Sequence, residues 1–504
     1  MAGKSIWPKA SPLRVAKALE AHSALALAFS GLIYLLCISG VLSVFNHELQ
    51  RWEQPRIEEM ATISPSAIQT VSDAVLVKEG AETSHFYIQM PTWDMPRTVV
   101  STDTQTLFAN SDGTIGEVEN HPWTQFILDL HYYLHLPHTA GLIVVGILGV
   151  MLLALGISGM LAHPRVFRDA FQFRIGRNER LTQADLHNRL SVWTSPFLIA
   201  SALSGAVLGL AGLISMSVAT ADYEGDVFAV YGAVFGEEPE ENDAPAPLAN
   251  IAAGIEYVST NYPETEITYV ILHEPKTEGQ YLQILAEHPD RLGFGEYYVF
   301  DADGTFVREV GMTSGEIGQQ IAASAYRLHF GSYGGLPIKL AYTVFGAALA
   351  FIIAAGLNIY FIKRREKGRD APRLEAIWAG LAWGAPAMLS ACLAVSLLFP
   401  SLHAYVVAIF WWSLTGGLVL SGIAAEKSLV AAVGRKVFSA FTALAIISHG
   451  VKYGGEYLSN PLYFAVALAA LGLVGIVMLW DFRASPTRID ISRWVTMLRR
   501  ERAL

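Results

Sequence analysis

The chain has 504 residues, of which 52% are hydrophobic and 16% charged, and its mean hydropathy is +0.37. This composition is typical of a polytopic membrane protein and excludes a soluble enzyme of several domains. The formal net charge is −10, and the two cysteines, Cys37 and Cys392, lie inside apolar stretches. A disulfide framework, an iron–sulfur centre and a zinc–thiolate site are therefore excluded.

Apolar runs close to the ~20 residues that cross a hydrocarbon core predict transmembrane helices. Eight such runs occur, at residues 23–46, 139–162, 190–218, 337–362, 376–399, 404–424, 437–453 and 462–481. The seventh is the weakest because Gly450 and Lys452 interrupt it. The first is too long for the core of a signal peptide, so we expect no cleavable signal peptide.

Basic residues gather in connections that share one side of the membrane if all eight runs span it. They are Lys4, Lys9, Arg14 and Lys17 before the first run, Arg165, Arg168, Arg174, Arg177 and Arg180 after the second, the segments 363–373 and 425–436, and six arginines after residue 481. Lysine and arginine in short loops mark the cytoplasmic side. Both termini are therefore expected in the cytoplasm.

Two long connections, residues 48–137 and 219–336, face the other side in this topology. Between residues 219 and 328 there are 20 acidic and 4 basic residues. Apolar alternation at 85–90, a strand–turn–strand pattern at 297–310, and helical stretches at 65–78 and 247–260 predict a small α+β module in each connection. The proline-rich, acidic segment 237–247 is predicted to be a linker or surface loop.

The predicted fold is a membrane all-α bundle of about eight transmembrane helices, with both termini cytoplasmic and an α+β module in the loops after helices one and three. The expected parts are an N-terminus with helix one (1–47), a first outer loop (48–137), helices two and three with their basic connection (138–218), a second outer loop (219–336), helix four (337–365), and an additional four-helix region with a basic tail (366–504).

Four of the fourteen histidines recur at matching distances before small residues. In one class 17 and 18 residues separate the histidine from a Ser-Gly pair, and in the other 27 or 28 residues separate it from a glycine. The members are His22 with Ser39-Gly40, His187 with Ser204-Gly205, His131 with Gly159, and His329 with Gly356. The chain is therefore predicted to contain a duplicated unit of helix, loop and helix.

The predicted topology sorts these histidines into two pairs. His22 and His187 lie at the cytoplasmic ends of helices one and three, and His131 and His329 lie at the outer ends of helices two and four. A single histidine at a membrane boundary is usually only an interfacial side chain. Two pairs at equivalent places of a repeat instead indicate a functional pathway. Paired imidazoles without carboxylates or thiolates favour a haem iron held from both sides over zinc.

Other histidines are second choices as ligands because the repeat does not duplicate them. They are His135, His138, His163 and His47. His135 is the strongest rival, because it follows His131 by one helical turn and both are expected to open helix two. Small residues near mid-helix, among them Gly31, Gly146, Gly149 and Gly156, allow close helix approach and could make room for a flat macrocycle.

Several segments carry a family resemblance in their order and spacing. After the helix that begins at His22 and ends at Ser39-Gly40 comes FNHELQRWEQP, LHYYL opens helix two, ISGMLAHPR ends it, DLHNRL opens helix three, and RLHFGSYGGLP precedes helix four. Over about residues 15–365 the chain resembles the PepSY-associated transmembrane helix family. It departs from the simplest four-helix pattern by about 140 further residues, and it has His163 where the family often has an aromatic residue.

The resemblance implies PepSY-like modules in the outer loops. Among members similar to inner-membrane ferric-siderophore reductases it also implies two b-type haems, each held by two histidines. Carried over by position, the ligand pairs are His22 with His187 and His131 with His329. The implied location is the bacterial inner membrane, with the long loops in the periplasm.

The leading hypothesis is a transmembrane electron conduit, an oxidoreductase that passes electrons from a cytoplasmic-side or quinol donor to a ferric chelate such as a ferric siderophore. The donor stays unidentified, because no glycine-rich phosphate fingerprint follows a predicted strand. The alternatives are a transporter or permease component without haem and a membrane-anchored module that binds proteins. The expected partners are membrane lipid and the chelate, and no basic surface points to nucleic acid.

Overall fold

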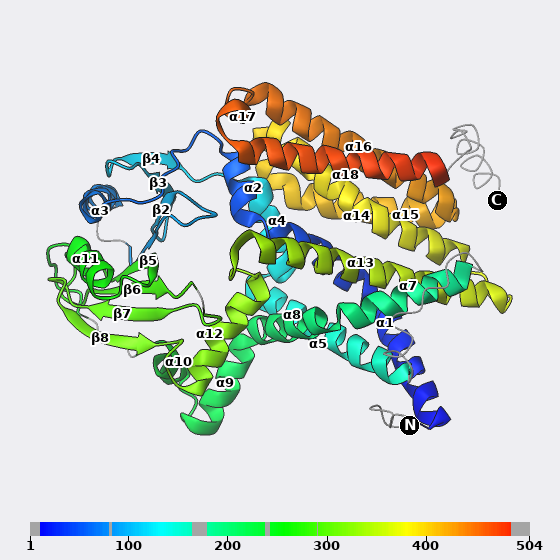
Figure 1. Cartoon of the computed structure of the whole chain (residues 1–504), viewed down its shortest axis with the longest axis horizontal. Coiled ribbons are helices and arrows are strands. Elements are labelled where there is room, and N and C mark those ends of the chain that lie inside the picture. The colour runs from blue at the N-terminus through cyan, green and yellow to red at the C-terminus, as the bar shows by residue number, and fades with distance from the viewer. Residues whose placement is uncertain (1–10, 80–82, 164–178, 237–241, 290, 485–504) are drawn as a thin grey trace, which may run out of the picture. The chain divides into compact units, whose positions relative to one another are not determined.

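The computed structural model describes residues 11–79, 83–163, 179–236, 242–289 and 291–484 (Figure 1). The chain divides into two compact units. We call residues 1–43, 122–203 and 343–504 the helical unit, and residues 44–121 and 204–342 the sheet unit. Several predictions of basic or linker segments fall outside the described residues: Lys4, Lys9, Arg165, Arg168, Arg174, Arg177, residues 237–241 of the linker, and the arginines after residue 484.

Seven helices among the described residues are long and apolar enough to cross a membrane. They are α1 (Pro12–Ser43), α5 (His138–Ala162), α13 (Gly335–Glu366), α14 (Pro372–Leu398), η1 with α15 (Pro400–Tyr405 and Val406–Ala424), α16 (Lys427–Lys452) and α18 (Pro461–Ala484). Proline begins α1, α14 and α18, where its missing N–H costs no helical hydrogen bond. The predicted run 437–453, the weakest of the eight, belongs to the 26-residue helix α16.

The predicted third span, residues 190–218, is not one continuous helix. It is divided among α7 (Glu179–Trp193), α8 (Ser195–Gly209) and α9 (Ala211–Asp222). The axes of α7 and α8 meet at 65°. Pro196 explains the break, because it has no N–H to bond to the carbonyl of Val192. An eighth span therefore exists only if the bent α7–α8 pair crosses as one unit.

Within the helical unit, α1 packs against α5 and against α4 (Pro122–Tyr133). Helix α14 packs against α15 and α16, and α16 packs against α18 (Figure 1). The short α17 (Glu456–Ser459) joins α16 to α18. One apolar cluster ties α1 and α13 to α14, and its buried members are Tyr34, Leu357, Phe361 and Trp378.

The sheet unit is built on one eight-stranded sheet in which each neighbouring pair is antiparallel. The strands are β1 (His85–Gln89), β2 (Thr98–Ser101), β3 (Thr106–Ala109), β4 (Ile115–Val118), β5 (Glu266–His273), β6 (Tyr281–Glu287), β7 (Glu296–Phe300) and β8 (Phe306–Gly311), in the order β4-β3-β2-β1-β5-β6-β7-β8. The helices wholly within this unit are α2 (Asn46–Glu53), α3 (Pro65–Glu79), α9, α10 (Val227–Phe235), α11 (Ile251–Asn261) and α12 (Ile317–Phe330).

The strands and helices predicted in the two loops are confirmed, but the two halves share a sheet. β1 pairs with β5 from His85 opposite His273 to Gln89 opposite Tyr269. As separate modules, each half would expose one of these strands as an open edge, and pairing satisfies both. Helices α3 and α11 cover one face, where alternate strand residues such as Phe86 and Val270 form the core (Figure 1).

Neither outer histidine opens a membrane-spanning helix, which corrects the prediction for helix two. His131 lies near the end of α4, and α5 begins only at His138. Between them Leu134 and His135 adopt left-handed φ values of 54° and 55°, and Pro137 follows, so no helix continues through. His329 likewise lies near the end of α12, and glycines with positive φ separate it from α13.

Candidate functional site

His22 on α1 and His187 on α7 lie side by side within the helical unit, with ring centres 6.2 Å apart. Nδ1 of His22 is 3.0 Å from the carbonyl oxygen of Leu155, and Nδ1 of His187 is 2.9 Å from that of Ile352. A carbonyl only accepts hydrogen bonds, so in each ring Nδ1 carries the hydrogen and the lone pair is on Nε2. Both rings are therefore held in the tautomer that suits metal ligation through Nε2.

Each of the four repeated histidines lies against a glycine of another helix. A Cβ atom at the glycine would fall 2.6–3.3 Å from Cε1 of the imidazole. The pairs are His22 with Gly159, His131 with Gly40, His187 with Gly356, and His329 with Gly205. The four glycines that the repeat singles out therefore leave room for the imidazoles, and we call each pair a histidine seat.

The seat glycines also explain the position of the backbone carbonyls that accept hydrogen bonds from the imidazoles. His131 Nδ1 is 3.1 Å from the carbonyl oxygen of Leu36, which precedes Gly40 by four residues. The acceptors of His22 and His187, Leu155 and Ile352, precede their glycines by the same four residues. The absence of a side chain on the glycine opens the carbonyl one turn earlier to the imidazole of a neighbouring helix.

A serine beside the glycine contributes to three of the seats. The Oγ atoms of Ser158, Ser39 and Ser204 lie 3.2, 3.2 and 3.3 Å from Nδ1 of His22, His131 and His329, respectively. The fourth seat has Ala355 at this position. The serine hydroxyl is thus a polar contact to the imidazole in these three seats.

Two seats tie α1 to the α4–α5 segment reciprocally. His22 of α1 lies against Gly159 of α5, and Gly40 of α1 receives His131 of α4. Eighteen residues of helix separate His22 from Gly40, which corresponds to ~27 Å. This length is close to the ~30 Å thickness of a hydrocarbon core. The two seats of α1 are therefore separated by nearly the thickness of a hydrocarbon core.

A cavity of about 700 Å³ adjoins His22 and His187, which we call the inner histidines, and belongs to the helical unit. Apolar side chains of α1, α5, α7, α8 and α13 make up most of its lining, and Gly156, Gly159 and Gly356 lie in its wall. Arg180, Lys363, Asn188 and His163 supply a polar part. Of the other glycines expected to make room for a cofactor, Gly31 instead lies against Leu381.

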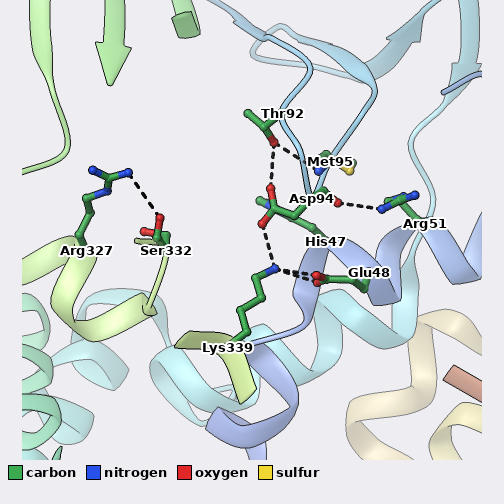
Figure 2. Close-up of polar contacts among 9 residues, drawn as sticks. All are labelled: His47, Glu48, Arg51, Thr92, Asp94, Met95, Arg327, Ser332 and Lys339. Atoms are coloured by element: carbon green, nitrogen blue, oxygen red, sulfur yellow. Dashed lines mark hydrogen bonds and ion pairs between the residues drawn. The ribbon is translucent and has the colours of Figure 1, made fainter. Parts of the chain in front are cut away.

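Figure 2 shows a cluster of buried charges in the sheet unit, at the start of α13. The Lys339 ammonium lies 2.8 and 2.9 Å from the carboxylate oxygens of Glu48 and 2.9 Å from Oδ2 of Asp94. Asp94 Oδ2 is also 3.2 Å from Nδ1 of His47. Burial acts to raise the pKa of Asp94, but His47 and Lys339 outweigh it and hold that pKa well below its ordinary value.

A second buried cation, Arg327, lies two residues before His329 on α12. It donates to the backbone oxygens of His288 and Arg291 at 2.9 and 2.7 Å and pairs with Glu287 at 2.9 Å. Its contact with the backbone of Ser332 appears in Figure 2. Burial raises the pKa of Glu287 to about 7, although Arg327 acts in the opposite direction.

The family model of the PepSY-associated TM region matches residues 19–364. The chain belongs to this family. A Pseudomonas aeruginosa protein described as uncharacterised, PA4219, is 26% identical over 262 residues. The match covers 50% of this chain and 66% of that relative, just under two thirds of its length. The PepSY-associated match ends near the end of α13, so α14–α18 lie outside it.

The inner histidines of this PepSY-associated chain fit a haem. A metal–imidazole bond is about 2 Å and the ring centre lies about 1 Å farther, so imidazoles on opposite sides of one metal have centres roughly 6 Å apart. The observed 6.2 Å agrees with this separation. The cavity volume lies within the range of about 300–1,000 Å³ found for small-molecule sites. Arg180 and Lys363 are suited to carboxylates of the bound group.

The four second-choice histidines are placed differently. His135 has both ring nitrogens engaged, by Phe126 O at 2.9 Å and by the indole N–H of Trp411 at 3.3 Å. His138 is exposed at the start of α5. His47 belongs to the Lys339 cluster. His163 lines the inner cavity, and its buried Nδ1 has no hydrogen-bond partner among the described residues.

The Lys339 cluster was not predicted from the sequence, although one signal for it exists. Lys339 lies inside the predicted span 337–362, and an ionisable residue there requires a partner of opposite charge. Its partners lie 291 and 245 residues earlier in the chain. Sequence spacing alone gives no means of finding them.

Proposed function

We propose that this chain carries electrons across a membrane by means of two b-type haems, each held by two histidines. The observation that carries the proposal is the juxtaposition of His22 and His187, with ring centres 6.2 Å apart beside an apolar cavity of about 700 Å³. Haem iron with two axial imidazoles exchanges single electrons and has no open position for oxygen or substrate.

The protein's own groups would fix the inner site before any cofactor enters. The carbonyls of Leu155 and Ile352 orient the two imidazoles, and Gly159 and Gly356 let the rings lie close to their helices. Such fixed hydrogen bonds at the nitrogen opposite the metal raise the basicity of the ligand. The apolar side chains of the cavity exclude water, which influences a redox potential.

The repeat extends the proposal to an outer site with His131 and His329. These histidines belong to different units, and each has its own seat, at Gly40 and at Gly205. Their equivalence rests on the sequence spacing. The ~27 Å between the seats of α1 is the support for placing the inner and outer sites near opposite membrane faces.

The proposed acceptor is a ferric chelate such as a ferric siderophore, reduced on the periplasmic side of a bacterial inner membrane. The proposed donor is a quinol or a soluble cytoplasmic reductant. The arginine distribution supports this orientation. Reporter fusions near residues 368 and 490 are expected to report cytoplasm, and fusions near 100 and 280 periplasm.

The visible spectrum of the purified protein tests the proposal. A low-spin haem spectrum that shifts with dithionite and does not respond to carbon monoxide is expected. His22→Ala and His187→Ala should each remove one haem, measured as pyridine haemochrome per protein. His138→Ala is the control, because this exposed histidine should leave both haems in place. Colourless protein from haem-replete cells would end the proposal.

One observation favours a second candidate function, a transporter component without haem. The 65° break between α7 and α8 resembles the discontinuous helices that line substrate sites in transporters. Colourless protein that moves iron or another small solute into proteoliposomes would favour this alternative. Haem at two per chain would exclude it.

A further inference from the structure

Helices α14–α18 lie outside the residues that match the family and carry none of the four repeated histidines. They are nevertheless joined to the histidine-bearing helices by specific polar contacts. Tyr34 on α1 donates its hydroxyl hydrogen to the carbonyl oxygen of Ala382 at 2.8 Å. Pro386, four residues later, has no N–H to bond to that carbonyl. Pro386 thus leaves the carbonyl of Ala382 free to accept the hydrogen bond from Tyr34 of α1.

A second contact reaches the start of α4, the short helix that carries His131. The indole N–H of Trp123 donates to the carbonyl oxygen of Leu389 on α14 at 3.0 Å. Trp123 is 5% exposed, so this hydrogen bond is shielded from water. A buried donor left without its acceptor would cost about 1–3 kcal/mol. The contact therefore fixes the start of α4 against α14.

A third contact holds the chain just after α4. Trp411 on α15 donates its indole N–H to Nδ1 of His135 at 3.3 Å, and Nε2 of His135 lies 2.9 Å from Phe126 O. Indole nitrogen only donates and a carbonyl only accepts, so His135 is neutral with its hydrogen on Nε2. The ring stacks on Phe126 at 4.6 Å, and Phe126 lies edge-on to Phe410 of α15 at 5.3 Å.

We propose that α14 and α15 position His131 and thereby set the reduction potential of the outer haem. The proposal rests on the proposed function, in which His131 is an axial ligand. Helix α4 has only 12 residues, and the C-terminal helices hold it before and after His131. Trp123, Trp411 and His135 are positioning residues, because they act on the imidazole of His131 through the α4 backbone.

Trp411→Phe tests the proposal, because it keeps an aromatic ring and removes only the N–H donor. Trp412→Phe is the matched control, since the neighbouring indole is 78% exposed on the same helix. The Trp411 variant should retain two haems but shift the midpoint potential and the low-spin EPR signal of one of them. The Trp412 variant should leave both haems unchanged.

His135→Asn keeps an acceptor at a position with left-handed φ and should shift the potential of the same haem less than His135→Ala does.

Hydrogen exchange supplies a readout that needs no haem. In haem-depleted protein, Trp411→Phe should speed exchange of the amides at residues 126–136 relative to Trp412→Phe. Unchanged exchange would overturn the proposal. Unchanged spectra of Trp411→Phe would also overturn it, provided that His131→Ala has lost one haem.

A different result would count against the proposed function. If His131→Ala keeps both haems, His131 is not the outer ligand and no effect on the potential is expected. Hydrogen exchange would still report whether α14 and α15 hold α4.

Discussion

The ends of α4 and α12 occupy equivalent places in the sequence repeat, yet different chemistry holds them. His131 on α4 lies between Trp123 and His135, which contact the C-terminal helices through neutral hydrogen bonds and stacked rings. In sequence, His329 on α12 is flanked by two buried cations, Arg327 and Lys339, whose ion pairs lie within its own unit. The two seats themselves are alike, since each imidazole lies against a glycine of another helix with a serine hydroxyl beside its Nδ1.

The difference shows what the repeat constrains. It retains the histidine and the glycine that receives it, while the groups that hold the surrounding backbone differ between the halves. A neutral aromatic anchor and a buried ionic anchor respond differently to mutation and to pH. The following experiments test that difference directly.

The largest effect is expected from Lys339→Met. This change leaves the carboxylates of Glu48 and Asp94 buried with no ammonium between them. Removing one partner of a buried ion pair typically costs about 3–5 kcal/mol. Thermal unfolding of the purified protein should show the loss, and adding Glu48→Gln and Asp94→Asn should recover much of it. A loss below about 1 kcal/mol would mean that the cluster is solvated and is no anchor.

A smaller loss is expected when a seat glycine gains a methyl group. In Gly205→Ala and Gly40→Ala the new Cβ would lie 2.6 and 2.7 Å from an imidazole carbon, so the ring must move away from its seat. Overpacking of this kind costs about 1–3 kcal/mol. Both variants should also bind less than two haems per chain.

Gly212→Ala on α9 is the matched control for the seat variants. No atom lies within 4 Å of its added Cβ, so this change should be neutral or stabilising by up to about 1 kcal/mol. Equal losses in the control and the seat variants would show that helix propensity, and not contact with the histidine, determines the effect.

The elements that the sequence predicted well depend on local pattern. Apolar runs located the spans, and alternation located strands such as residues 85–90. The pairing of β1 with β5 was missed because it depends on how distant segments meet. The break at Pro196 was missed although a proline inside an apolar run is a local signal for one. The sequence predicted only one half of each histidine seat correctly. The repeat singled out Gly40, Gly159, Gly205 and Gly356, but the glycines were expected to allow helix approach and not to receive imidazoles.

One signal in the sequence could have revealed the seats. His22 and Gly40 share α1 and stand 18 residues apart, and His187 on α7 and Gly205 on α8 have the same spacing in the other half. If the first two predicted helices run antiparallel, the histidine at the start of one lies beside the last turns of the other, where the other's glycine lies. His22 would then meet Gly159, and His131 would meet Gly40. The anchors gave no such signal, because Trp411 and Lys339 have no counterparts in the repeat.

The pH response should separate the two anchors more subtly. Burial raises the pKa of Glu287 to about 7 from an ordinary 4.5, so the stability it contributes is full below pH 4.5 and is lost as pH rises through 7. Burial lowers the pKa of His135 below 6.5, so its contribution is present above that pH and is lost on acidification. The stability contributed by Glu287 therefore falls as pH rises, whereas the stability contributed by His135 falls as pH is lowered.

Glu287→Gln isolates the ionic half of this prediction. The variant should match the parent in thermal midpoint near pH 4.5 and exceed it at pH 8, where the parent must hold a buried carboxylate. Glu256→Gln, at an exposed position on α11, should show no pH-dependent difference. A Glu287 variant that is less stable at pH 8 would show that the ion pair with Arg327 outweighs the burial of Glu287.

The smallest effect, no change in haem content, is expected from His135→Ala. Sequence spacing alone left His131 and His135 as rivals because both were expected to face one side of a single helix. The structure places them in different elements, and both nitrogens of His135 are already engaged by Phe126 O and Trp411. His135→Ala should therefore keep two haems per chain and lose stability of only about 1–3 kcal/mol, because it leaves the Trp411 N–H without an acceptor. His131→Ala should keep one haem. The opposite result, one haem in His135→Ala and two in His131→Ala, would make His135 the ligand and would require the α4–α5 junction to rearrange when haem binds.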